Sequence, residues 1–138
     1  MNARDLMIGD WVKNQECLCK VISIASDGIY FEDEFGEGVC SYNRLEPVPL
    51  TPEILEKNGF VFFDDYDSYN NKPIRRYEYK RDGYKCGMSA NDTDGYYFTF
   101  GIPYNGLYFN IVRALHIRSV HEFQHALRLC GIDLDIVI

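Results

Sequence analysis

The sequence predicts an α+β protein, mostly β, in which an N-terminal SH3-like small barrel precedes an antiparallel meander sheet packed by a C-terminal helix. Three observations support this prediction. The 138 residues include 11 Tyr and 9 Phe, and aromatic side chains favour strands. Turn signals containing glycine recur at short intervals in both halves of the chain, as hairpins require. A capped amphipathic pattern near the C-terminus predicts one helix.

The first 49 residues contain four or five short strand patterns separated by turns. Residues 18–24 carry apolar side chains on both faces, which is typical of a strand in a closed or well-covered sheet. Residues 26–28 and 36–38 have the composition of hairpin turns. We therefore predict a small barrel-like module over residues 1–49, with residues 50–138 as the second module.

A short connector helix is predicted at the start of the second module. Thr51 can cap its N-terminus, and Pro52 suits the first helical position because that N–H has no partner within the helix. Gly59 can end it in the left-handed conformation.

After this helix, the sequence predicts a meander of four or five antiparallel strands. A polar loop is expected over residues 64–71, and the strongest hairpin signals are Asp82-Gly83, Asp92–Gly95 and Asn105-Gly106. The segments from which these strands would form are residues 60–63, 74–80, 84–88, 96–100, 107–111 and 115–118.

The final helix is predicted from a capping box, with Ser119 at the N-cap and Glu122 three residues later. Its apolar stripe would pack onto the meander sheet, and Gly131 would end it. The apolar stripe consists of Val120, Phe123 and Leu127, extended by Cys130. The polar face of the helix consists of His121, Gln124, His125 and Arg128.

The same segment has the His-Glu-x-x-His spacing of zinc hydrolases. His121 and His125 would be the metal ligands, Glu122 the general base, and His116 a third ligand. A third ligand in the usual downstream position is lacking, because Gly131 stands there. Since the capped helix explains the same residues, we expect no cofactor, and zinc remains the alternative.

The formal net charge of −7 disfavours direct binding to nucleic acid or to anionic membranes. It leaves an acidic decoy of nucleic-acid-binding proteins as a further alternative. The N-terminus lacks an apolar signal-peptide core, so we expect a cytoplasmic protein whose five cysteines are small buried side chains. Against the acidic background, Arg75, Arg76, Lys80 and Arg81 form a basic cluster that is a candidate contact for an anionic partner.

Residues 1–12, 45–60 and 120–127 together resemble a family of small uncharacterised proteins from gut anaerobic bacteria and their prophages or mobile elements. The resemblance implies no activity, cofactor or site residue. It favours a non-enzymatic cytoplasmic interaction or accessory protein of phage or mobile-element origin, with another protein as its partner. The minimal zinc hydrolase and the acidic decoy are the alternative functions.

Overall fold

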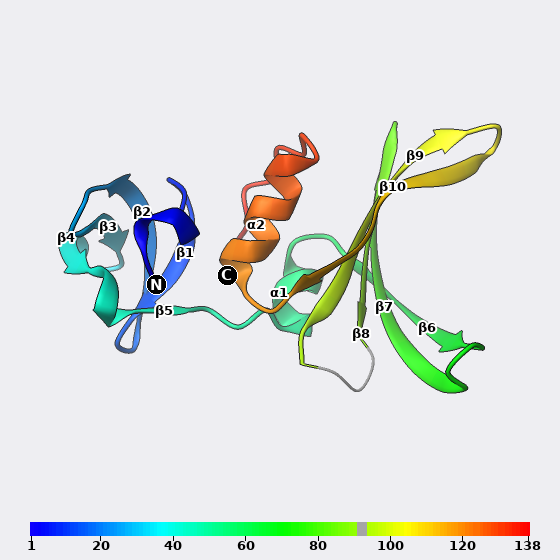
Figure 1. Ribbon diagram of the computed structural model, residues 1–138, viewed down its shortest axis with the longest axis horizontal. Helices are drawn as coiled ribbons and strands as arrows, with labels where there is room; N and C mark the ends of the chain where they lie inside the picture. The colour runs from blue at the N-terminus through cyan, green and yellow to red at the C-terminus, as the bar shows by residue number, and fades with distance from the viewer. Residues whose placement is uncertain (91–93) are drawn as a thin grey trace. The chain divides into compact units, whose positions relative to one another are not determined.

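The computed structural model describes residues 1–90 and 94–138, which form two five-stranded antiparallel sheets and two α-helices (Figure 1). The predicted class, α+β and mostly β, is confirmed. Two compact units are formed: Met1–Pro49 with Ser119–Leu129, and Leu50–Arg118 with Cys130–Ile138. None of the described helices is long and apolar enough to cross a membrane.

The sheet of the first unit has the strand order β4-β3-β2-β1-β5. Two 3₁₀ turns accompany it, η1 (Ala3–Asp5) before β1 and η2 (Tyr42–Arg44) before β5. The strands are β1 (Trp11–Asn14), β2 (Cys17–Ile24), β3 (Gly28–Asp33), β4 (Gly36–Ser41) and β5 (Leu45–Pro47).

The first sheet encloses a small core that includes Val12, Val21 and Ile29. Gly28 is required at the start of β3, where the backbone of the neighbouring β4 comes close, since a Cβ there would lie 2.2 Å from the Cys40 carbonyl oxygen. Within the described residues, the edge strands β4 and β5 do not pair with each other, so the sheet is open. The closed barrel predicted from the sequence is therefore not established.

The helix α2 (Val120–Leu129) belongs to the same compact unit as the first sheet. Its predicted caps are present, because Ser119 Oγ accepts from the Glu122 N–H at 3.4 Å and Gly131 has a φ of +72°. The backbone of Val120 also donates to the Val48 carbonyl at 2.9 Å. The sequence pattern predicts this helix on the meander sheet, whereas Ser119–Leu129 cluster with the first sheet because the polar face of the helix bonds to its backbone.

The sheet of the second unit has the order β10-β9-β8-β7-β6, the meander that the sequence predicts. At the Asn105-Gly106 turn both residues have positive φ, 51° and 78°, as a two-residue hairpin turn requires. Of the predicted turn at Asp92–Gly95, residues 92 and 93 lie outside the described residues. The strands are β6 (Val61–Asp67), β7 (Lys72–Arg81), β8 (Tyr84–Ala90), β9 (Tyr96–Tyr104) and β10 (Leu107–Ile117).

Two strand boundaries differ from the sequence prediction. Asp64–Asp67, predicted as part of a polar loop, continues β6 because these residues pair with β7. The segments predicted separately at 107–111 and 115–118 join into β10, whose register against β9 shifts after Asn110 and again after Val112. Local composition cannot show either result, because strand pairing sets both boundaries.

The connector helix is confirmed as α1 (Pro52–Lys57) in the second unit. The Thr51 side chain accepts from the Ile54 N–H at 3.3 Å, and Gly59 follows with a φ of +88°. The Asn58 amide then joins α1 to the C-terminal segment, donating to the Val137 carbonyl and accepting from its N–H.

Candidate functional site

The polar face of α2 is bonded to the segment Gly9–Trp11 that leads into β1. Gln124 donates from Nε2 to the Gly9 carbonyl and accepts the Trp11 N–H at Oε1, both at 2.9 Å. One amide side chain thus satisfies two backbone groups of a segment more than 110 positions away, as a neighbouring strand would. Gln124 is itself buried.

Asp10 lies at the centre of this contact and is fully buried. Its Oδ2 is 2.7 Å from His125 Nε2, and its Oδ1 accepts from the Arg128 guanidinium at 2.8 Å. The Met7 N–H also donates to Oδ2 at 2.7 Å. A buried carboxylate with these partners stabilises one arrangement of the strand entry and the helix. We call Asp10, Gln124, His125 and Arg128 the helix clamp.

His121 lies one turn before His125 and is buried beside the clamp. Its Nδ1 is 3.1 Å from Ser119 Oγ, and its ring meets the His125 ring edge-on at 5.7 Å between centroids. Burial lowers the pKa of His121, outweighing the opposite effect of Asp10 and Glu122. A neutral imidazole is therefore favoured at this position.

The predicted zinc residues are distributed over both units. His121 and His125 lie in the first unit with Ser119 and Asp10 as their partners. His116 lies in the second unit, with Nε2 at 2.7 Å from the Asp94 carbonyl oxygen and its ring against Tyr97. Among the described residues no group of three or more His, Cys, Asp or Glu side chains is placed to hold a metal ion.

Glu122, the predicted general base, lines an open pocket of about 480 Å³ in the first unit. The pocket mixes acidic, basic and imidazole groups, so no single sign of charge dominates it. Its walls are Met1, Arg4, Asp5, Pro47, His121, Glu122 and His125.

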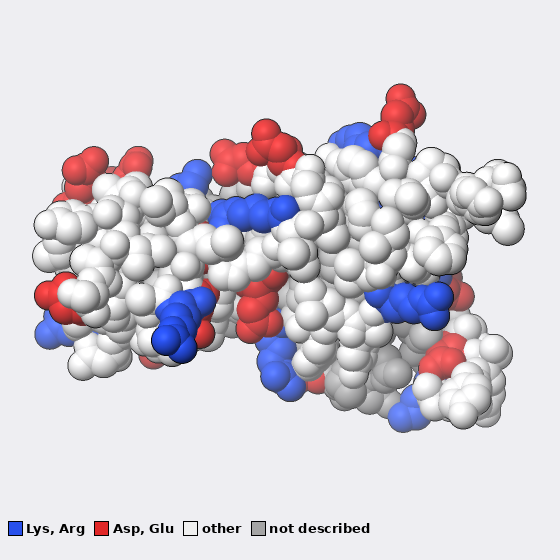
Figure 2. Space-filling model, turned by 45° about the horizontal axis from the view of Figure 1, so that its top comes forward, with Lys and Arg blue, Asp and Glu red and all other residues white. Residues whose placement is uncertain are grey.

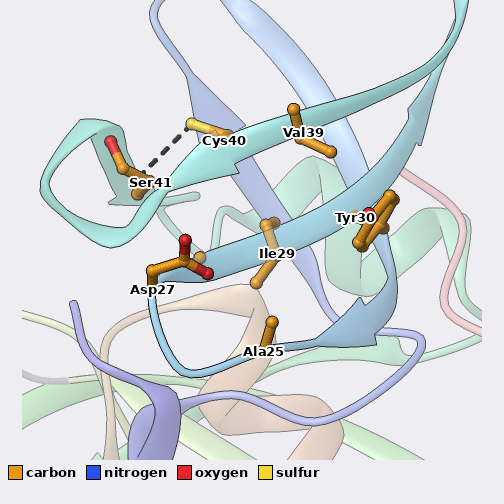
Figure 3. Close-up of a pocket in the computed structure, with 8 residues that line it drawn as sticks. Ala25, Asp27, Ile29, Tyr30, Val39, Cys40 and Ser41 are labelled. Atoms are coloured by element: carbon orange, nitrogen blue, oxygen red, sulfur yellow. Dashed lines mark hydrogen bonds between the residues drawn. The ribbon is translucent and has the colours of Figure 1, made fainter.

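A second pocket of the first unit, about 320 Å³, lies along β3 and β4 (Figure 3). Ile29, Tyr30 and Val39 supply its apolar walls, and Asp27 stands at one end. Cys40 bonds through Sγ to the Ser41 carbonyl at 3.4 Å, and burial raises the pKa of its thiol. A thiol of raised pKa is a poor nucleophile at neutral pH, so the pocket offers apolar surface but no activated group.

The four residues of the predicted basic cluster do not form one patch. Strand alternation directs Arg76 and Lys80 to one face of β7, and Arg75 and Arg81 to the other. Arg76 pairs with Asp65 at 3.0 Å and with Glu78 at 3.5 Å. Lys80 and Arg81 meet again at the end of β7, where they line a pocket of about 480 Å³ with Asp82, Gly83 and Tyr108.

The end of the β9–β10 hairpin exposes several large apolar side chains of the second unit. In the described sheet, β8 pairs with β9 only as far as Gly101, so residues 102–109 continue as a two-stranded ribbon that projects beyond it (Figure 1). We call residues 102–109 the tip ribbon. Its exposed large side chains are Ile102, Tyr104, Leu107 and Phe109, with Leu107 at 75% and Phe109 at 57% exposure.

None of the described residues 102–109 is charged, although the chain as a whole carries −7. The contrast is visible at the right-hand side of Figure 2, where the end of this hairpin is white and the end of the β6–β7 hairpin carries both red and blue side chains. This ribbon therefore differs from an ordinary solvated turn in leaving large apolar side chains exposed without charged neighbours among its own residues.

No protein-family model, curated protein or solved structure matches the chain.

Sequence reasoning missed the structural role of Asp10 and the exposure of the tip ribbon. Asp10 follows a glycine and precedes a strand, so its position is typical of an exposed turn residue and does not indicate a buried carboxylate. The available signal was the spacing of Gln124, His125 and Arg128, three groups able to bond a backbone segment and a carboxylate. The sequence of the tip ribbon predicts a strand and a hairpin turn, and this pattern does not indicate that its side chains stay exposed.

Proposed function

We propose that this protein is a non-enzymatic interaction protein that binds a partner protein through the tip ribbon of its second sheet. The observation that carries the proposal is the exposure of Leu107 and Phe109 on a projecting, uncharged hairpin. Burying one such side chain is worth about 1.5–3 kcal/mol, so a partner that covers both gains a large part of a typical binding free energy.

The apolar side of the tip ribbon extends the buried side of the second sheet. Ile102 and Tyr104 follow Phe98 and Phe100 at alternate positions of β9, and Phe98 is fully buried. Leu107 and Phe109 stand opposite Tyr104 and Ile102 on β10. A two-stranded ribbon is only marginally stable by itself, so covering its apolar side would also order it. This supports a binding role for the ribbon.

The helix clamp supports a non-enzymatic function. Both histidines of the His-Glu-x-x-His segment have hydrogen-bond partners within the first unit, and that segment joins α2 to the entry of β1. Burial also raises the pKa of the Cys19 thiol to about 11 and that of Cys86 to about 12, which suits packing and not nucleophilic attack.

We infer that the first unit is related in architecture to SH3-like barrels. Its strand order β4-β3-β2-β1-β5, with a 3₁₀ turn directly before the last strand, supports this inference. The resemblance of the sequence to small proteins of gut anaerobic bacteria and their mobile elements is in keeping with an accessory role. We propose that the first unit supports the chain and that the second unit contacts the partner.

Affinity capture from a lysate of a gut anaerobic bacterium tests the proposal when three baits are compared. These are the unchanged chain, Leu107→Ser/Phe109→Ser, and the control Tyr30→Ser/Val39→Ser, which removes exposed apolar side chains from the first sheet instead. We expect a protein that the unchanged chain and the control retain and the ribbon variant loses. Equal capture by all three baits, or capture of nothing reproducible, would overturn the proposal.

A further inference from the structure

The outer edge of the tip ribbon is a regular strand edge. β10 is the last strand of its sheet and, in the described part of the chain, pairs with β9 alone. Its register is unbroken from Leu107 opposite Tyr104 to Asn110 opposite Gly101, and the first shift follows Asn110. Such an edge offers alternate backbone N–H and C=O groups to an added strand, over a length of about four residues.

The two sides of this edge differ in chemistry. Strand alternation directs Leu107 and Phe109 to one side and Tyr108 and Asn110 to the other. The first side is apolar, because Leu107 and Phe109 stand beside Tyr104 and Ile102.

The second side is basic. Lys80 Nζ lies 5.3 Å and Lys85 Nζ 4.8 Å from the centre of the Tyr108 ring. Gly101, the Cα partner of both Lys85 and Asn110, places no side chain between β8 and β10 on this side. Arg81 lines a pocket with Lys80 and Tyr108, but its guanidinium stacks on the Tyr79 ring at 4.0 Å, and Asp82 is the carboxylate in the wall of that pocket. Glu78, also on this side, is 3.9 Å from Lys85.

The opposite edge of the sheet has the reverse charge. β6 contains Asp64, Asp65 and Asp67 and no basic residue, whereas residues 96–118 contain Arg113 and Arg118 and no acidic residue. The acidic side chains along β6 would repel an acidic strand that paired with that edge. At β10 an acidic strand would meet no acidic side chain of the edge strand itself.

We propose that the Leu107–Asn110 edge binds an extended segment of the partner protein in which acidic and apolar side chains alternate. The backbone of the segment pairs with β10. Its apolar side chains cover Leu107 and Phe109, and its carboxylates lie near Lys80 and Lys85 beside Tyr108. This rests on the proposed function and specifies the chemistry of the partner.

A short acidic segment fits better than a long polyanion. The cations beside Tyr108 are Lys80 and Lys85, Arg81 lines one pocket with Lys80, and the chain as a whole carries a net charge of −7. A nucleic acid would extend its phosphates beyond the pocket and meet that negative charge. It also lacks the apolar side chains that would cover Leu107 and Phe109.

Fluorescence anisotropy of a labelled eight-residue peptide of alternating Glu and Val, titrated with the full chain, tests the proposal. We expect saturable binding that weakens between about 0.05 M and about 0.5 M salt. Lys80→Gln/Lys85→Gln should weaken it about tenfold, the effect of losing two surface ion pairs, and the matched change Lys13→Gln/Arg44→Gln should not. A peptide with Lys in place of Glu should not bind.

Equal binding of the Glu and Lys peptides, or binding unaffected by Lys80→Gln/Lys85→Gln in a variant with unchanged thermal unfolding, would overturn the inference. Sedimentation tests a second copy of this chain as the occupant. Concentration-dependent self-association that Leu107→Ser/Phe109→Ser abolishes would show that a second copy occupies the edge, and would overturn the inference as well.

The lysate capture separates failure of this inference from failure of the proposed function. A captured protein that depends on Leu107 and Phe109 but is not displaced by the Glu-Val peptide contradicts the inference and leaves the proposed function standing. Capture that is independent of both residues contradicts the proposed function itself.

Discussion

The helix clamp and the tip ribbon use their side chains in opposite ways. In the clamp, charged and polar groups that look reactive in the sequence are bonded to one another and to backbone, with Asp10 fully buried at the centre. In the tip ribbon, side chains that look like ordinary sheet packing are exposed, Leu107 at 75%. The difference teaches that a motif indicates function only if its groups remain available after folding.

The largest expected effect tests the clamp. Asp10→Ala removes the partner of Arg128 and His125 and leaves the Met7 N–H without its acceptor. We expect a loss of about 3–5 kcal/mol in the free energy of unfolding, measured in urea, because the change breaks a buried charge network. Asp27→Ala, at an exposed turn, should change it by less than about 0.5 kcal/mol. Similar losses in both variants would contradict the clamp.

A smaller effect is expected from Gln124→Ala. The Gly9 carbonyl and the Trp11 N–H both lose the amide partner, and because both hydrogen bonds are only partly buried, we expect a cost of about 0.5–1.5 kcal/mol for each. Gln124→Glu keeps an acceptor for Trp11 but has no donor for Gly9, so its unfolding free energy should lie between those of the alanine variant and the unchanged chain. If the glutamate variant is as stable as the unchanged chain, the bond to Gly9 has no energetic role.

The pH dependence of stability sharpens the comparison further. Burial lowers the pKa of His121 in the folded state, so the unfolded state binds its proton more readily. The contribution of neutral His121 is complete above the unfolded pKa of 6.5 and is lost as the pH falls through the lower folded value. Urea unfolding between about pH 7.5 and about pH 5 should therefore show a flatter profile for His121→Gln than for the unchanged chain. Parallel profiles would contradict a buried neutral histidine.

The smallest effect on stability is expected at the tip ribbon. Leu107→Ser/Phe109→Ser should alter the free energy of unfolding by less than about 0.5 kcal/mol per site, because both side chains are exposed. In this variant, thermal unfolding should thus stay nearly unchanged while capture of the partner is lost. A loss as large as that of Asp10→Ala would assign the ribbon to the folded core.

Local chemistry made much of the fold predictable. The capped helix at Thr51 and the Asn105-Gly106 hairpin were recognised because each depends on neighbouring residues. Pairing over distance was not predictable: Gln124 recognises the backbone of Gly9 and Trp11 across more than 110 positions, and β6 extends through three aspartates because β7 pairs with it.

The candidate site was predictable only in part. Lys80 and Arg81 were identified as basic, but their meeting with Tyr108 depends on the order of the strands in the sheet. The exposure of Leu107 and Phe109 follows from where β8 stops pairing with β9, which no local pattern records.

Backbone hydrogen exchange, with and without the Glu-Val peptide, tests the central claim most directly. If the tip ribbon is the binding surface and the helix clamp is structural, the peptide should slow exchange at Leu107–Asn110 and leave Val120–Leu129 unchanged. Slower exchange in Val120–Leu129 with no change in β10 would contradict the account.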